Sequence, residues 1–318
     1  MKVHQLPITI VIPVLNEEQT IDSLLQSLEQ QTAQPSEILF VDGGSIDSTL
    51  SIIKEYKKIR VHQLPKSNRS QARNYGIKKA SSEIIIVTDA GCIPKNDWLE
   101  KITAPLLIEY ADVVAGFYDT NPQNQFEEIV SNVTSVRPWN FDEKTFLPSS
   151  RSLAFTKKVW KEVKGYPEEL NTCEDLVFAE RLKKSAKKWV VKKEAQVIWK
   201  QPKTLTSLME KVTNYALGDL EAEYERHTKK IRSAMWRIGI LLGLGLPLLF
   251  VPFSMIKFFG IGLFVLYIIG CWMKHRIVIK SITYFVYAPL IQFAVDVALF
   301  QAWLEYQFAR ASKSPFSH

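Results

Sequence analysis

The sequence has few cysteines, and their placement excludes two classes of small, cross-linked protein. Three occur in 318 residues, namely Cys92, Cys173 and Cys271, and no two of them form a CxxC pair. An odd number of widely spaced cysteines supports neither a disulfide framework nor a structural zinc site. Glycine and proline are also modest, at 13 and 15 residues, which excludes a collagen-like or low-complexity chain.

Charge and hydrophobicity are divided unevenly along the chain. There are 40 Lys and Arg against 33 Asp and Glu, for a net charge of +7, and 47% of the residues are hydrophobic. The mean hydropathy of −0.04 averages two unlike parts, because residues 1–235 carry nearly all the acids and residues 238–300 are mostly apolar. This balance excludes a disordered chain and predicts a soluble domain followed by a membrane-seeking tail. DNA-binding motifs and aromatic-basic interleaving are absent, so we expect no nucleic-acid partner.

The first part of the chain alternates between strand and helix patterns. Strand patterns cover residues 8–14, 37–41, 60–64 and 83–88, and helical patterns cover 20–31, 47–56 and 70–80. Strands alternating with helices of about ten residues indicate a parallel sheet covered on both faces. The first apolar run ends at Leu15-Asn16-Glu17-Glu18 rather than at a small-residue cleavage site, so we do not expect a signal peptide.

Acidic residues or glycines follow three of the predicted strands. The chain reads Asn16-Glu17 after the first strand, Asp42-Gly43-Gly44-Ser45 after the second, and Asp89-Ala90-Gly91-Cys92 after the fourth. In a parallel sheet these ends share one edge, where ligands bind. Each loop alone fits ordinary turn chemistry, but three at one edge favour a ligand site. Neither GxxxxGKS/T nor GxGxxG occurs, so the P-loop and dinucleotide fingerprints are absent.

Five motifs together identify a family resemblance. They are PVLNEE, VDGGSIDST, RSQARNYG, TDAGC and CEDLVFAERL. In this order and spacing they resemble family 2 glycosyltransferases, over about residues 7–200. The resemblance implies an α/β fold of the GT-A type, a Rossmann-like mixed sheet with flanking helices, followed here by C-terminal transmembrane or interfacial helices. It also implies transfer of a sugar from a nucleotide donor to an acceptor, with inversion at the anomeric carbon.

The resemblance assigns donor-binding roles to residues of the first four motifs. Pro13, Asn16 and Glu17 would line the nucleobase and ribose, and Asp42 would contact the nucleoside. Arg73 would meet the diphosphate oxygens, because a planar guanidinium matches them in a fork. The expected donor-binding set is Pro13, Asn16, Glu17, Asp42, Gly44, Arg73, Asn74, Asp89 and Ala90.

Asp89 matches the first acid of the family's DxD motif, so the resemblance implies a divalent cation there. Mg²⁺ or Mn²⁺ suits oxygen ligands and would stabilise the charge on the departing nucleotide. Two acids common among relatives are absent, because Gly43 follows Asp42 and Gly91 takes the third DxD position. We expect UDP as the carrier of the sugar and leave GDP open.

The paired acids Glu174 and Asp175 are the expected catalytic residues. An inverting transfer to a hydroxyl needs a carboxylate that accepts its proton, and the resemblance places that base at Asp175. A close carboxylate pair raises the pKa of one member, so Glu174 is included in the site. The alternative is that two acids open a surface helix at the positive end of its dipole.

Residues 121–150 interrupt the regular alternation. They are polar and aromatic, with Phe126, Trp139, Phe141 and Phe146, which favours a lid or an acceptor-facing insertion over a second core. Beyond them, residues 150–155 predict a strand and residues 159–163 a short helix. We interpret Cys92 and Cys173, which flank site motifs, as small buried residues.

The segment from Thr204 to Tyr224 has an apolar stripe and is followed by a run of cations. These cations are Arg226, His227, Lys229, Lys230, Arg232 and Arg237. The pattern fits either a helix packed on its own domain or an amphipathic helix at the membrane interface.

A long apolar region follows this basic segment. Between Arg237 and Lys274 lie 36 residues with a single charge, at Lys257. One helical crossing takes roughly 20 residues, so two crossings fit only as a tight hairpin at 238–273, turning near residues 252–257, unless one half is re-entrant. A third segment at 281–304, interrupted by Pro289 and Asp296, either crosses the membrane or lies in its interface. Asp296 requires a polar partner or a lipid head group.

We therefore predict a catalytic domain at 1–203, an interfacial and basic segment at 204–235, membrane helices at 236–304 and a tail at 305–318. The flanking cations place both hairpin ends, and so the catalytic domain, in the cytoplasm, near anionic lipid. The expected protein is a metal-dependent, inverting glycosyltransferase acting on a lipid-linked or cell-envelope polysaccharide acceptor. The alternatives are a polyprenyl-phosphate sugar synthase, which needs no base, and a non-catalytic nucleotide-sugar-binding or scaffold protein.

Overall fold

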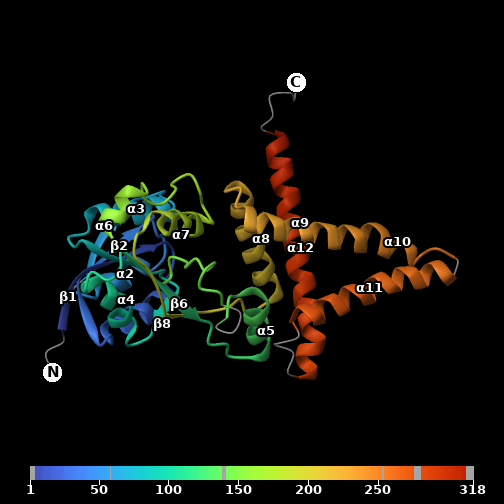
Figure 1. Cartoon of the computed structure of the whole chain (residues 1–318), viewed down its shortest axis with the longest axis horizontal. Coiled ribbons are helices and arrows are strands. Elements are labelled where there is room, and N and C mark those ends of the chain that lie inside the picture. Colours follow the sequence, from blue (N-terminus) through green and yellow to red (C-terminus); the bar gives the residue numbers. More distant parts are fainter. Residues whose placement is uncertain (1–3, 58, 138–140, 253, 276–280, 313–318) are drawn as a thin grey trace. The chain divides into compact units, whose positions relative to one another are not determined.

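The computed structural model describes residues 4–57, 59–137, 141–252, 254–275 and 281–312 (Figure 1). The chain forms two compact units. The sheet unit comprises residues 1–121 and 142–200, and the helical unit comprises residues 122–141 and 201–318.

The sheet unit is built on one eight-stranded mixed sheet, in the order β3-β2-β1-β4-β7-β6-β8-β5. Its strands are β1 (His4–Val14), β2 (Ala33–Asp42), β3 (Ile59–Gln63), β4 (Ile84–Val87), β5 (Cys92–Pro94), β6 (Val113–Asp119), β7 (Leu153–Thr156) and β8 (Trp189–Trp199). The four strands expected in the first part of the chain pair in parallel, as predicted. β7 runs antiparallel to β4 and β6, and β5 runs antiparallel to β8, so the sheet is mixed.

Helices cover both faces of this sheet. They are α1 (Ile21–Glu29), α2 (Thr49–Lys54), α3 (Arg69–Lys79), α4 (Trp98–Leu107), α6 (Lys157–Glu162) and α7 (Glu174–Ser185). Successive residues of a strand point to opposite faces. Accordingly, Ile10 packs in one core with Leu24 of α1 and Trp98 of α4, and Val11 packs in the other with Ile77 of α3 and Phe178 of α7. The uninterrupted apolar run of β1 reflects this burial on two sides.

The helical unit contains the remaining helices. They are α5 (Gln125–Thr134), α8 (Leu205–Glu221), α9 (Glu225–Ile240), the π-helix η2 (Leu241–Gly245), α10 (Leu246–Leu248), α11 (Ser254–His275) and α12 (Ile282–Ser312). Ile129 and Val130 of α5 are buried in one cluster with Leu208 of α8 and Ile291 of α12. The expectation of a lid or acceptor-facing insertion at 121–150 is therefore wrong for α5, whose apolar face completes a second core. Trp139 lies outside the described residues.

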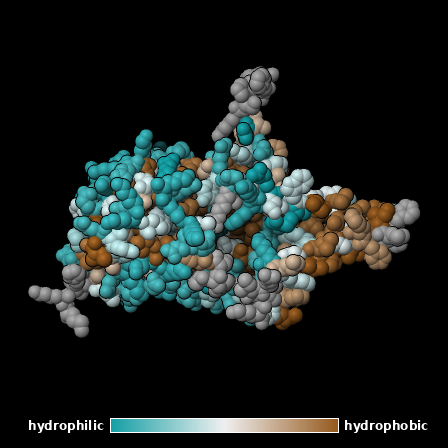
Figure 2. Space-filling model, in the orientation of Figure 1, coloured by the Kyte–Doolittle hydropathy of each residue, from teal (hydrophilic) through white to brown (hydrophobic). Residues whose placement is uncertain are grey.

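Among the described residues of this unit, three helical stretches are long and apolar enough to cross a membrane. They are His227–Leu248, Ile256–His275 and Ile282–Ser312. The first two form the expected hairpin, which reverses between Leu248 and Ser254. Its two arms approach closely, because a Cβ added at Gly260 would lie only 2.9 Å from the carbonyl oxygen of Gly245. Figure 2 shows the strongly hydrophobic surface over this hairpin.

The third stretch is one continuous helix that includes Pro289 and Asp296, the two residues that interrupt its apolar sequence. Proline lacks an N–H and leaves the carbonyl four residues earlier without its helical donor. Here the indole Nε1 of Trp272 donates to that carbonyl, Phe285 O, at 2.7 Å. Asp296 is fully buried and is paired with Arg237. Partners from the hairpin thus allow α12 to continue through both residues.

The buried carboxylate of Glu37 joins three neighbouring parallel strands, and its replacement therefore tests the fold. Glu37 on β2 accepts hydrogen bonds from Thr9 of β1 at 2.8 Å and from the backbone and hydroxyl of Ser81 at 2.8 and 2.9 Å, and it pairs with Arg60 of β3. Burial alone would raise the pKa of Glu37, but these hydrogen bonds outweigh it and hold the pKa below its ordinary value of 4.5.

Replacing Glu37 by Gln removes the charge that these donors share. We expect the free energy of unfolding to fall by about 1–3 kcal/mol, measured by urea unfolding at pH 7. Because the folded-state pKa is lowered, the wild-type advantage should be complete above pH 4.5 and disappear as the pH falls through the folded value. The exposed Glu100, which accepts one bond from Thr32, provides the control variant Glu100→Gln. Equal unfolding midpoints for the two variants would contradict this role.

Candidate active site

Three charged side chains form a chain of ion pairs at the carboxyl ends of the parallel strands. Asp89 follows β4, Arg73 lies on α3, and Glu174 is the first residue of α7. Arg73 Nη2 donates to Asp89 Oδ1 at 2.7 Å, and Arg73 Nη1 donates to Glu174 Oε1 at 2.7 Å. The structure therefore brings together three of the residues predicted from separate motifs.

The guanidinium of Arg73 is enclosed by this arrangement. Its side chain is only 1% exposed, and it lies 5.2 Å from the ring centroid of Tyr166. Burial would lower the pKa of Arg73, but the charges of Asp89 and Glu174 outweigh it and raise the pKa. As it lies here, Arg73 is closed off from a donor diphosphate, in contrast to the expected fork, and it positions two carboxylates instead.

Local structure fixes the start of α3 and hence the position of Arg73. Asn68 and Gln71 form a reciprocal capping box, in which each side chain accepts from the other's backbone N–H. One turn later, the Asn74 amide donates to Tyr166 O and Glu168 Oε1 and accepts from Tyr166 N and Trp160 Nε1. All its hydrogen-bonding positions are thus used within the chain, and its expected contact with a donor stays a prediction.

Asp175 differs from its neighbours because no cation pairs with it directly among the described residues. It lies in the first turn of α7, half-buried, and accepts a hydrogen bond from its neighbour's backbone, Leu176 N, at 2.8 Å. Burial, reinforced by the negative charge of Glu174, raises the pKa of Asp175 to about 6. A carboxylate with such a pKa can accept a proton near neutral pH.

The backbone before α7 has an uncommon conformation. Cys173 has φ = 65°, in the left-handed region that residues with a Cβ seldom adopt. This turn allows both acids to follow directly at the helix start. Cys92 and Cys173 are buried, as interpreted from the sequence.

The loops after β1 and β2 hold each other. The buried Asp42 carboxylate accepts from Gly44 N at 3.2 Å and from the hydroxyl of Ser45 at 2.6 Å. Asn16 Oδ1 accepts from Ile46 N at 2.9 Å, and Asn16 N donates to Ser45 Oγ at 3.0 Å. Gly44 has φ = +106°, which a residue with a Cβ would strain to adopt. Asp42 and Asn16 therefore shape these loops, and their contacts with a nucleoside stay predictions.

Glu17 lies beside the position of the missing DxD acid. A Cβ added at Gly91 would meet only Glu17 Oε2, at 3.9 Å, whereas one added at Gly43 would lie 3.2 Å from Ser67 O. A side chain thus has room at position 91 and is crowded at position 43. Pro13 and Ala90 are both buried, so neither side chain faces the open side of the site.

Sequence reasoning did not identify Arg151, which lies next to Asp89. Its Nε is 3.9 Å from Asp89 Oδ2, and its guanidinium stacks 3.8 Å from the ring centroid of Trp199 at the end of β8. Burial would raise the pKa of Asp89, but the charges of Arg73, Arg151 and Arg69 outweigh it and hold the pKa below its usual range. The sequence signal was weak, because Arg151 fell inside a predicted strand.

The residues at Asp89 fit a divalent cation only in part. The Asp89 side chain is 30% exposed, and its Oδ1 atom is taken by Arg73. Mg²⁺ takes one or two carboxylates and completes its shell with waters and substrate phosphates, so Asp89 Oδ2 suits such an ion. Among the described residues, no group of three or more His, Cys, Asp or Glu could hold a metal.

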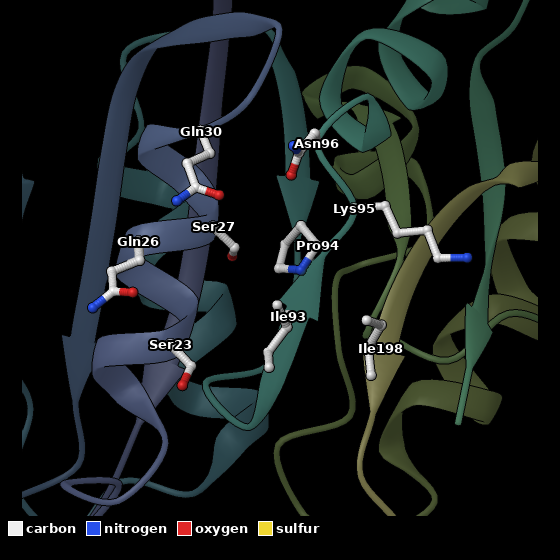
Figure 3. A pocket seen from close by; sticks show the side chains of 9 residues that line it. All are labelled: Ser23, Gln26, Ser27, Gln30, Ile93, Pro94, Lys95, Asn96 and Ile198. Atoms are coloured by element: carbon white, nitrogen blue, oxygen red, sulfur yellow. The ribbon is translucent and has the colours of Figure 1, made fainter. Parts of the chain in front are cut away.

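A separate groove of about 520 Å³ lies between α1 and β5 (Figure 3). Ser23, Gln26, Ser27 and Gln30 of α1 line one side, and residues 93–96 line the other. None of the predicted site residues lines this groove, and none of its lining side chains is a carboxylate. It therefore does not contribute to the ion-pair chain at Arg73.

Comparison with known proteins relates part of the chain to a known family. The glycosyl transferase family 2 profile matches residues 9–157. Glycosyltransferase GlyG of Streptococcus pneumoniae is 33% identical over 177 residues, covering 49% of this chain and 58% of that protein. O-antigen chain rhamnosyltransferase RfbN of Salmonella typhimurium is 23% identical over 191 residues, covering 55% and 60%. The aligned region thus spans at most about three fifths of these relatives.

Solved structures show the same fold at low identity. Mannosyltransferase PcManGT from Pyrobaculum calidifontis, in complex with GDP-Man and Mn²⁺, has a TM-score of 0.59 at 14% identity, covering 97% of this chain and 90% of that one. TarS 1-349 of S. aureus in complex with UDP-GlcNAc has a TM-score of 0.52 at 18% identity, covering 94% and 91%. The GT-A arrangement expected for the mixed sheet is confirmed. With the curated relatives, the profile shows that residues 9–157 form a glycosyltransferase family 2 domain.

Proposed function

We propose that this protein transfers a sugar from a nucleotide-sugar donor, UDP-linked, to a hydroxyl of a lipid-linked or cell-envelope acceptor, with inversion at the anomeric carbon. The observation that carries the proposal is Asp175, a carboxylate with a pKa of about 6 beside the Glu174–Arg73–Asp89 ion-pair chain. GlyG, RfbN and TarS bear names of glycosyltransferases, and TarS is named as a poly(ribitol-phosphate) β-N-acetylglucosaminyltransferase. A UDP donor is supported by the TarS complex with UDP-GlcNAc.

In the proposed reaction Asp175 removes the proton of the acceptor hydroxyl as its oxygen attacks the anomeric carbon. The bond from that carbon to the donor phosphate breaks, and the nucleoside diphosphate leaves. Glu174 keeps Asp175 basic through its negative charge, and Arg73 holds Glu174 and Asp89 in place. Arg151, beside Asp89, is the cation best placed to face the departing diphosphate. A divalent cation at Asp89 would supply further charge stabilisation when bound.

We also propose that the protein works at the cytoplasmic face of a membrane. Three apolar helices long enough to cross it support membrane association. The cytoplasmic side rests on the cations at both ends of the hairpin, of which Arg237 and Lys274 are examples. An acceptor carried by a lipid would then reach the same surface as the soluble donor.

The role of Asp175 can be tested by the substitution Asp175→Asn. Loss of a general base typically costs about 10²–10⁴ in rate, so we expect turnover to fall by that factor while UDP affinity is retained. In the wild type, activity should rise with pH through about 6, because Asp175 acts only when deprotonated, and this rise should be absent from the residual activity of the variant.

The matched control is Glu180→Gln on the same helix, where the carboxylate pairs with Lys184 at the surface. It should leave the rate and the pH profile unchanged. A near-normal rate for Asp175→Asn would contradict a hydroxyl acceptor and favour a phosphate acceptor, as in a polyprenyl-phosphate sugar synthase, since an ionised phosphate needs no base.

The donor and its metal can be tested by calorimetric titration with UDP and GDP, each with and without Mn²⁺. We expect UDP to bind with Mn²⁺ and binding to be lost in Asp89→Ala. Gly91→Asp, which has room beside Glu17, should tighten Mn²⁺-dependent binding about tenfold, since Mn²⁺ suits carboxylate ligands. Gly43→Asp, which is crowded by Ser67 O, should not. Preference for GDP would redirect the donor assignment, and no binding of either nucleotide would favour the non-catalytic alternative.

A further inference from the structure

The helical unit contains a polar cluster in its apolar interior, centred on Asp296 of α12. The Asp296 carboxylate is fully buried. Its Oδ1 accepts from Arg237 Nη2 at 2.7 Å and from Gln292 Nε2 at 2.8 Å, and its Oδ2 accepts from Arg237 Nε at 2.8 Å and from Tyr267 OH at 3.0 Å. The carboxylate thus has a complete set of donors from three helices, and it needs no further ligand.

The same network holds a second cation at the end of α11. Gln292 is buried and donates to Asp296. Its Oε1 atom accepts a hydrogen bond from Lys274 Nζ at 2.8 Å and lies 3.0 Å from His275 Nε2. An amide oxygen only accepts, so His275 Nε2 carries a hydrogen in this contact. Lys274 is exposed, and within the described part of the chain no carboxylate forms an ion pair with it. Its ammonium is therefore held in one place with N–H groups still free.

The charges around Lys274 are predominantly positive. Among the described residues, the charges that act on its ammonium include the negative charge of Asp296 and the positive charges of Arg237 and Lys230. Lys230 and Arg237 lie seven residues apart on α9, so they share one face of that helix. Arg237 already uses three of its five N–H groups on Asp296 and Ser233. Lys274 thus adds a positive charge beside the Asp296–Arg237 pair, and its ammonium offers open donors.

This excess of positive charge lies at the open end of the hydrophobic hairpin. Arg237 and Lys274 bracket its apolar residues in the sequence, and Figure 2 shows the hydrophobic surface over the hairpin that contains α10 and α11. Large apolar side chains of the hairpin are exposed: Phe250 is 79% exposed, Phe258 is 71% exposed and Met273 is 66% exposed. Trp236, which precedes Arg237 in the sequence, is 75% exposed. Exposed apolar side chains with tryptophan and cations at one end are typical of a helix pair in a bilayer, with that end at the head groups.

We propose that the Lys274 ammonium, supported by Arg237 and Lys230, binds the phosphate of an anionic membrane lipid. A phosphate oxygen accepts the free N–H groups of Lys274, and its charge offsets the positive excess of the cluster. The lipid's acyl chains lie along the exposed apolar face of the hairpin. The site does not depend on the transfer reaction, so it holds or fails independently of the proposed function.

The test uses the full-length protein in neutral detergent, titrated calorimetrically with dihexanoyl phosphatidic acid. We expect saturable binding that Lys274→Gln weakens by about tenfold or more, since a charge-assisted hydrogen bond is lost. The matched control is Lys229→Gln, which removes the same charge from an exposed pair with Glu225 and should change affinity within about twofold. Because Lys274 is exposed, its variant should keep the wild-type thermal midpoint without lipid.

Two further probes separate the sources of binding. Dihexanoyl phosphatidylcholine should bind much more weakly, because it carries no net charge, and inorganic phosphate should bind more weakly, because it has no acyl chains. Equal losses in Lys274→Gln and Lys229→Gln would show diffuse attraction and overturn the site. Inorganic phosphate binding as tightly as the lipid would show a site for a free anion, and phosphatidylcholine binding as tightly would show that the acyl chains alone bind.

Discussion

The buried guanidinium of Arg73 is the interaction on which the site depends. A charge that is 1% exposed is tolerated only when its partners are close and well aligned, and here those partners are Asp89 after β4 and Glu174 at the start of α7. Removing either acid would leave a buried charge partly uncompensated. The need of Arg73 for close partners therefore links three elements, namely α3, the end of β4 and the start of α7. It also explains why the RSQARNYG, TDAGC and CEDLVFAERL motifs occur together, since each supplies one member of a single ion-pair chain.

Much of the sheet could be predicted from the sequence, because the signals there are local. β1, β2 and β4 are apolar runs ended by Asp, Asn or Gly, and parallel strands deliver such ends to one edge. β5, β6 and β8 had no predicted counterpart. β5 has only three residues, and β6 contains a glycine that a local pattern interprets as a break. The candidate site residues were proposed from motifs, and their contacts depend on residues far away in the sequence. The residues next to Arg73 in the sequence do not predict that Asp89 and Glu174 enclose its guanidinium. The stacking of Arg151 on Trp199 is likewise not predicted by local sequence.

The helical unit shows the same limit for residues that oppose a helix. Pro289 and Asp296 each carry a local cost, and the sequence alone shows only that they interrupt an apolar segment. The compensating groups are remote: Trp272 lies 13 residues from Phe285, and Arg237 lies 59 residues from Asp296. The local sequence shows that Pro289 and Asp296 require hydrogen-bonding partners within the helical unit. The identity of those partners, Trp272 and Arg237, becomes visible only once the hairpin is packed against α12. The same reasoning applies to α5. Its segment was expected to form a lid or an acceptor-facing insertion, because its packing against α8 and α12 cannot be inferred from its own sequence.

Each unit is organised around a buried arginine–carboxylate pair. In the sheet unit the Arg73 guanidinium pairs with both Asp89 and Glu174, and the negative charge of Glu174 helps to raise the pKa of Asp175. A nucleoside diphosphate at this edge would meet these three carboxylates, and the proposed metal ion and the guanidinium of Arg151 beside Asp89 would offset their charge. In the helical unit Asp296 pairs with Arg237, and Gln292 links Lys274 to the same carboxylate. Lys274 therefore adds a cation that Asp296 does not pair with directly, and it is there that we propose a lipid phosphate binds.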